Sequence, residues 1–185
     1  SPSTARRAGS PRRASISRSS NRSPTRVAER ECPSPPGRGV CGEGAGYYLG
    51  LDFGTSGARA SVLDGQGEVA FESRAAYAEP ASPQAWRAAL FELIAAIPAG
   101  IRGRLAALAI DGTSGTLLAT DPAFEPISPA LLYNDGRATE EAGLIGRPQY
   151  GPASGLAKRL WLARHHPDAA FCFHQADWLA ALLTG

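Results

Sequence analysis

Residues 45–185 are predicted to form a mixed α/β layer fold, and three features of the sequence indicate it. An apolar run at residues 47–53 leads directly into a glycine-rich turn, as a buried strand at the start of a hairpin does. An amphipathic helical pattern follows, and a second apolar run at residues 105–110 comes after the helix. Strands and helices that alternate in this way pack as layers around one core. The chain of 185 residues leaves room for one sizeable domain.

The first half of this domain reads as a three-stranded meander followed by a helix. Residues 58–64 and 69–77 are the predicted second and third strands, and residues 64–67 are the turn between them. Ser82 followed by Pro83 is typical of a helix N-cap and first helical position. Apolar residues then repeat at helical spacing up to Pro98, namely Trp86, Leu90, Leu93, Ile94 and Ile97.

The second half mixes short strands, polar loops and helices. Residues 105–110 are expected to form a buried strand, 111–115 a polar loop, 116–120 a fifth strand and 130–134 a further short strand. Helices are expected near residues 138–144, 156–164 and 177–183. The three tryptophans, Trp86, Trp161 and Trp178, lie in apolar patterns and are expected in the core.

Residues 1–44 differ in composition from the rest and are predicted to be a disordered leader. They are rich in Arg, Ser, Pro and Gly and have too few large apolar residues to offset the entropy of ordering. Seven arginines and no acid precede residue 29, a composition found in organelle transit peptides. A plain disordered tail, or sequence translated from a wrong start, is the alternative.

Charge and cysteine content exclude several classes of function. The leader has a net charge of +6, whereas the remainder has −4, so the folded part lacks the basic surface of a nucleic-acid-binding domain. No apolar stretch of about 18 residues occurs, so no membrane-spanning helix is expected. Three cysteines without C-x-x-C spacing (Cys32, Cys41, Cys172) indicate neither a disulfide framework nor a zinc site. The histidines His165, His166 and His174 lack partners at metal-binding spacing and are expected at the surface or at helix caps.

The segment of residues 50–59, Gly-Leu-Asp-Phe-Gly-Thr-Ser-Gly-Ala-Arg, is a candidate phosphate site. Gly54 and Gly57 would let the backbone approach an anion closely. Thr55 and Ser56 would add hydroxyl donors to the backbone N–H groups, and Arg59 would neutralise the charge of the anion. Asp52, at the end of the strand, is placed to hold Mg²⁺ beside a phosphate. An ordinary hairpin whose glycines supply positive φ is the alternative. The pattern is neither a P-loop nor a dinucleotide-binding fingerprint.

Two further loops carry polar residues directly after apolar runs. Asp-Gly-Thr-Ser-Gly-Thr occupies residues 111–116, and Tyr-Asn-Asp-Gly-Arg occupies 133–137. Either loop alone could be an Asx-turn or a helix cap. Three such loops in one chain favour a ligand site, because loops at strand ends line the pockets of α/β sheets.

Together these segments resemble the FGGY carbohydrate kinases, and the resemblance covers residues 47–185. Residues 52–59 are similar to the family's first phosphate motif, and residues 133–137 are similar to its Asn-Asp-Gly-Arg turn. Four later segments are similar to further motifs of the same domain in this family: Leu160-Trp161, His165-His-Pro167, Asp177-Trp-Leu179 and the closing Leu-Thr-Gly185. The resemblance implies a ribonuclease-H-like fold of the actin/hexokinase ATPase type, as the incomplete N-terminal half of a two-domain kinase. The Ile-Asp-Gly-Thr-Ser-Gly-Thr form of residues 110–116 is closer to the D-ribulose kinases of plants and cyanobacteria than to many xylulokinases, which also suits a plastid leader.

The resemblance also implies the roles of individual residues. Asp52, Thr55, Ser56, Gly57 and Arg59 would face Mg²⁺ and the transferred phosphate of ATP, and Thr113 and Ser114 would contact hydroxyls of a small sugar. Asp135 and Arg137 would either contact the sugar or brace its pocket. The family's general base lies beyond Gly185, so this chain is expected to be inactive alone. A non-catalytic actin-like module that binds nucleotide or sugar is the alternative, and the resemblance leaves the oligomeric state open.

Overall fold

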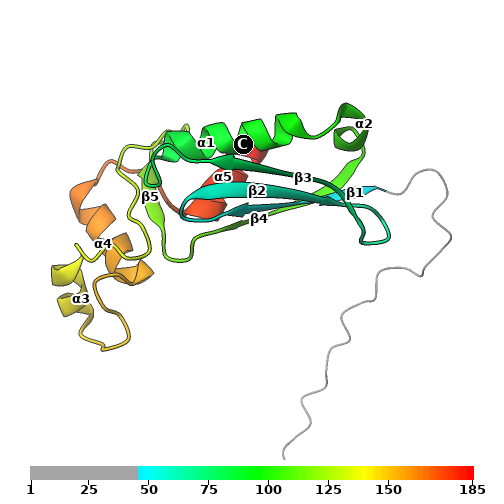
Figure 1. Cartoon of the computed structure of the whole chain (residues 1–185). Helices are drawn as coiled ribbons and strands as arrows, with labels where there is room; N and C mark the ends of the chain where they lie inside the picture. The colour runs from blue at the N-terminus through cyan, green and yellow to red at the C-terminus, as the bar shows by residue number, and fades with distance from the viewer. Residues whose placement is uncertain (1–45) are drawn as a thin grey trace, which may run out of the picture. The chain divides into compact units, whose positions relative to one another are not determined.

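The computed structural model describes residues 46–185, which form two small sheets and five helices (Figure 1). The larger sheet has the strand order β3-β2-β1-β4, with β1 at Tyr47–Phe53, β2 at Gly57–Leu63, β3 at Val69–Ala76 and β4 at Leu105–Gly112. β1 pairs antiparallel with β2 and parallel with β4, and β2 pairs antiparallel with β3. The predicted meander and α/β layering are therefore confirmed. The predicted leader, with Cys32 and Cys41, lies outside the described residues.

Helix α1 (Pro83–Ala96) begins as the sequence predicts. The Ser82 hydroxyl accepts a hydrogen bond from the backbone N–H of Ala85 at 3.2 Å, and Pro83 occupies the first helical position. A four-residue helix, α2 (Ala99–Arg102), follows Pro98 and was not predicted. It is too short to show a helical period, so the sequence pattern could not reveal it.

The main core lies between one face of the larger sheet and the helices α1 and α5 (Gln175–Thr184). Trp86 and Trp178 are fully buried there and meet edge to face, with ring centroids 6.3 Å apart. Each indole N–H donates to a backbone oxygen at 2.9 Å, of Pro80 and Phe124 respectively. These two tryptophans are core residues as predicted, whereas Trp161 is only half-buried.

No helix of residues 46–185 covers the opposite face of this sheet (Figure 1). Buried and exposed residues therefore alternate along β1, where Leu51 and Phe53 face the core and Asp52 faces outward. The prediction that β4 is buried is wrong. β4 pairs only with β1 among the described strands, so it forms an edge, and its Leu108 is 48% exposed.

The smaller sheet pairs β5 (Leu117–Thr120) antiparallel with β6 (Phe171–His174). β5 is the predicted fifth strand, but it does not join the larger sheet, and β6 was not predicted. The strand expected at residues 130–134 is also wrong. Only Leu131 pairs there, in a single bridge with Leu117, because the chain turns at once, with the N–H of Asp135 bonded to the carbonyl of Leu132.

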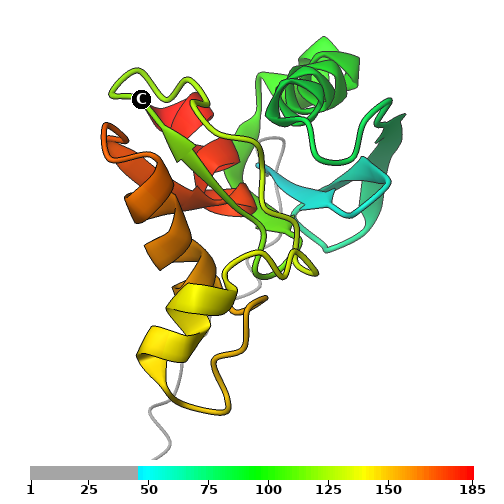
Figure 2. The same cartoon turned by 90° about the vertical axis from the view of Figure 1, so that its left-hand side faces the viewer.

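Helices α3 (Thr139–Ile145) and α4 (Gly155–His165) lie side by side (Figure 2). Arg164 of α4 forms ion pairs with Glu140 and Glu141 of α3, the second at 3.3 Å. Both helices and α5 agree with the predicted positions to within two residues. Within residues 46–185, no helix has the length and apolar content needed to span a bilayer.

Candidate functional site

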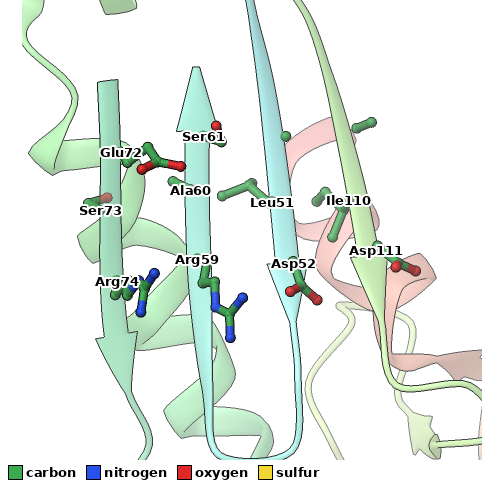
Figure 3. Close-up of a pocket in the computed structure, with 12 residues that line it drawn as sticks. Leu51, Asp52, Arg59, Ala60, Ser61, Glu72, Ser73, Arg74, Ile110 and Asp111 are labelled. Atoms are coloured by element: carbon green, nitrogen blue, oxygen red, sulfur yellow. The ribbon is translucent and has the colours of Figure 1, made fainter. Parts of the chain in front are cut away.

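A row of four charged side chains crosses the open face of the larger sheet. Asp52 on β1 lies opposite Arg59 on β2 and opposite Asp111 on β4, and Arg59 lies opposite Arg74 on β3. Figure 3 shows these four side chains beside one another across the four strands. They line one side of a cavity of about 420 Å³ with Gly50, Ser61 and Glu72. Two of the four, Asp52 and Arg59, were predicted site residues.

Two of the three neighbouring pairs in the row have like charges, and only the middle pair, Arg59 and Asp52, has opposite charges. Like charges directly opposite each other on neighbouring strands destabilise a sheet, and the row contains one pair of arginines and one pair of aspartates. None of the four forms an ion pair with another described residue. Paired guanidinium groups suit a phosphate, and paired carboxylates suit a hard cation such as Mg²⁺. The row can therefore hold an anion and a cation next to each other.

Arg74 and Asp111 were not among the predicted site residues, although the sequence contained a signal for both. The predicted turn at residues 64–67 sets the register of the hairpin, and this register places Arg74 opposite Arg59. Asp111 was expected in the polar loop that follows an apolar run, whereas it lies within β4.

The tight turn between β1 and β2 carries the other predicted phosphate-binding residues. Thr55 and Ser56 are exposed at its tip, and the N–H of Gly54 donates to the carbonyl of Gly57 at 3.1 Å. The packing of the hairpin against β3 also requires a glycine at position 57. A Cβ atom at this position would lie 2.6 Å from the carbonyl oxygen of Ala75, so the close approach of β3 requires glycine there whether or not an anion binds.

Tyr77 is a further residue near Asp52 that the sequence did not single out. Its hydroxyl is buried and has no hydrogen-bond partner among the described residues. Burial, and then the negative charge of Asp52, raise the pKa of Tyr77, so the phenol stays protonated. Its hydroxyl is therefore a free donor in the neighbourhood of Asp52.

The loop after β4 contains the two predicted sugar-contacting residues, and they differ in their surroundings. Thr113 is held by the protein, because its hydroxyl donates to the carbonyl of Phe53 at 3.3 Å and its N–H donates to Oε1 of Gln175 at 2.8 Å. Gly112 packs against the start of α5, where a Cβ would lie 3.1 Å from the N atom of Ala176. Ser114 is exposed, and its hydroxyl forms no hydrogen bond with another described residue. The hydroxyl of Thr116 also lacks a partner among the described residues but is fully buried, so Ser114 is the exposed hydroxyl of this loop that is free for a ligand.

Asp135 and Arg137 bind each other and do not line the cavity of the charged row. Nε of Arg137 donates to Oδ1 of Asp135 at 2.9 Å, and a terminal nitrogen lies 2.8 Å from Oδ2. The guanidinium lies 5.1 Å from the ring centroid of Trp161, in a cation–π contact. Burial raises the pKa of Asp135, but the hydrogen bonds and charge of Arg137 and the charge of Lys158 lower it further, so the net shift is downward. Of the two roles implied for this pair, bracing is the one this geometry favours.

Solved sugar kinases share the fold of this chain. The xylulose kinase of Bifidobacterium adolescentis superposes with a TM-score of 0.60 at 23% identity, over 76% of this chain and 34% of that one. The glycerol kinase of Plasmodium falciparum, solved with ADP, superposes with a TM-score of 0.59 at 14% identity, over 72% of this chain and 33% of that one. The predicted actin/hexokinase-like ATPase fold is therefore confirmed for the described residues.

Curated relatives with similar sequences are carbohydrate kinases. The xylulose kinase of Klebsiella pneumoniae is 31% identical over 149 residues, which cover 70% of this chain and 30% of that protein. The xylulose kinase of Escherichia coli is 30% identical over 151 residues, with the same coverage. The chain thus spans about a third of the length of these relatives. No family model matches it.

Proposed function

We propose that this chain is the N-terminal part of an FGGY-family carbohydrate kinase, which transfers a phosphoryl group from ATP to a sugar hydroxyl. The charged row is the observation that carries the proposal, because it places carboxylates beside arginines in the lining of one cavity, next to the turn between β1 and β2. The similarity to curated xylulose kinases supports it. The chain covers only about a third of those relatives, so the complete protein is the enzyme under this proposal.

Asp52 and Arg59 have the central roles on the phosphate side. The unpaired carboxylate of Asp52 fits Mg²⁺, and Asp111 offers a second carboxylate on the neighbouring strand. Arg59 would neutralise phosphate charge, with the exposed hydroxyls of Thr55 and Ser56 as further donors. Bound Mg²⁺ neutralises charge on the phosphates of ATP, and the protein contributes mainly position and electrostatic stabilisation.

On the sugar side, Ser114 offers its hydroxyl to the acceptor. The Thr113 hydroxyl donates its proton to the carbonyl of Phe53, and this bond orients the loop. The same hydroxyl oxygen can still accept a hydrogen bond from a hydroxyl of the sugar. Asp135 and Arg137 hold the neighbouring loop in shape.

We infer a ketopentose as the acceptor, with D-ribulose as the first candidate and D-xylulose as the second. The form of residues 110–116 supports D-ribulose, and the names of the curated relatives support D-xylulose. The test is to assay the complete protein with ATP, Mg²⁺ and each sugar, and to compare kcat/KM. Phosphorylation of either ketopentose supports the proposal. Nucleotide binding without any sugar phosphorylation would favour the non-catalytic module instead.

Residues 1–44 are proposed to act as a plastid-targeting leader, on the basis of their arginine-rich, acid-poor composition. A fusion of these residues to a fluorescent protein tests this, since import into isolated plastids is expected. Retention outside the plastids would remove the targeting role and leave the kinase proposal intact.

A further inference from the structure

Lys158 is the single lysine of a chain that otherwise has eighteen arginines, and it is fully buried. It lies in α4, and it forms no ion pair with a described residue. A buried charge is costly unless hydrogen bonds compensate for it. A buried lysine in a chain that uses arginine elsewhere therefore calls for a specific explanation.

The ammonium group of Lys158 joins two loops that are distant in sequence. Nζ donates to the carbonyl oxygen of Gly115 at 2.7 Å, to that of Leu132 at 2.7 Å and to that of Tyr133 at 3.3 Å. Gly115 follows Ser114 in the first loop, and Tyr133 precedes Asp135 in the second. All three protons of one ammonium group are thus used on the two loops that carry the predicted sugar-side residues.

Lysine suits this position better than arginine does. Three donors point in different directions from one ammonium nitrogen, whereas a guanidinium presents its donors in one plane and is larger. The three carbonyls belong to backbone that is not part of a helix, and the first two lie in different loops. A compact donor between them is the contact that sets the distance from one loop to the other.

We propose that Lys158 is a positioning residue that holds residues 113–116 and 131–137 in one mutual geometry, and so sets the sugar side of the site. This inference rests on the proposed function for its link to a sugar. The coupling of the two loops can be measured without any substrate.

The first test compares amide hydrogen exchange in three variants of the chain: Lys158→Met, Lys158→Arg and the control Arg159→Met. Arg159 is the exposed neighbour of Lys158 in α4, so its replacement also removes one positive charge but breaks no loop contact. We expect at least about tenfold faster exchange of the Thr116 and Asp135 amides in both Lys158 variants, because three carbonyls lose their donor or receive a misfitting one. The amide of Ala60 in β2 should be unaffected, and the control should behave as the native chain.

Other outcomes would overturn the inference. Faster exchange in only one loop would show that Lys158 does not couple the two. Equally faster exchange of every amide in the Lys158 variants would show that Lys158 stabilises the whole domain and not these two loops in particular. A native exchange pattern in Lys158→Arg would show that charge alone suffices.

A measurement on the native chain keeps the inference testable if the variants fail to fold. Burial lowers the pKa of Lys158 below 10.5, although the nearby carboxylate of Asp135 opposes this shift. Deprotonation leaves two N–H donors for three acceptors. The carbonyl ¹³C signals of Gly115, Leu132 and Tyr133 should therefore shift with one common midpoint below pH 10.5. Separate midpoints, or no shift, would contradict the shared contact.

The link to function is tested in the complete protein. Lys158→Met should raise the KM for the sugar at least about tenfold and leave the KM for ATP unchanged, because only the sugar-side loops move. Equal changes in both KM values would refute a role specific to the sugar. If the complete protein phosphorylates no sugar at all, the proposed function fails, and the exchange experiment still decides whether Lys158 couples the loops.

Discussion

At the scale of single residues, the structure separates side chains that are free for a ligand from side chains that the protein already uses. Asp52, Arg59 and Ser114 make no side-chain bond to a described residue, whereas the side chain of Thr113 is bonded to the end of β1 and that of Arg137 to Asp135 in its own loop. The sequence alone could not make this distinction. Polar residues that bind a ligand and polar residues that brace a loop have the same types and the same spacing.

Ser114→Ala in the complete protein tests the free hydroxyl. A lost hydroxyl contact leaves a polar group of the sugar unpaired, so transition-state stabilisation should fall by about 1–3 kcal/mol. This corresponds to a decrease in kcat/KM for the sugar of roughly 5- to 150-fold. The KM for ATP should stay constant, because Ser114 does not line the cavity of the charged row. Unchanged sugar kinetics would remove Ser114 from the site.

Asp135→Asn tests the bracing pair through the dependence of stability on pH. A carboxyl group whose pKa is lowered in the folded state adds stability above its ordinary value of 3.8, and this stability is lost as pH falls through the lowered value. The native chain should therefore exceed the variant in stability by about 0.5–1 kcal/mol at neutral pH. The difference should shrink as pH falls below 3.8. Thermal midpoints measured against pH check this, and a difference independent of pH would contradict it.

At the scale of elements, the hairpin of β1 and β2 was predicted closely and the surroundings of β4 were not. Period-2 alternation and turn residues are local signals, and they placed β1, β2 and β3 within a residue or two. Whether an apolar strand is central or at an edge depends on strands that are distant in sequence, so the exposure of β4 was hidden. β6 has only four residues and runs directly into α5, which leaves no local pattern to detect.

Gly57→Ala tests the packing of the hairpin against β3. The added Cβ would lie 2.6 Å from the carbonyl oxygen of Ala75, so backbone must shift, at a cost of about 1–3 kcal/mol in the free energy of unfolding. Gly100→Ala in α2 is the control, since no atom lies within 4 Å of its Cβ and its φ is negative. Denaturant unfolding of both variants gives the comparison, and equal stability of the two would show that the hairpin tolerates the extra atom.

At the scale of the whole molecule, the described residues contain one side of the proposed binding site. The charged row lies on a sheet face that no described helix covers, and the chain spans about a third of its curated relatives. The sequence motifs predicted the hairpin that places Asp52 opposite Arg59, because strand, turn and charge are adjacent there, and the phosphate-binding role of these residues stays a prediction. The joining of the two sugar-side loops through Lys158 could not be predicted, because it brings together residues 115, 132 and 158.

The most direct test of the proposed kinase site is Asp52→Asn in the complete protein, with kcat and the thermal midpoint measured on the same preparation. Asp52 has no bonded side-chain partner among the described residues, so its replacement should leave stability nearly unchanged. If its charge organises Mg²⁺ beside the transferred phosphate, kcat should fall at least about 100-fold. A variant that is stable and inactive is the predicted result. A variant that loses about 1 kcal/mol of stability but keeps its turnover would show an aspartate that only caps a turn, and it would contradict the proposed function.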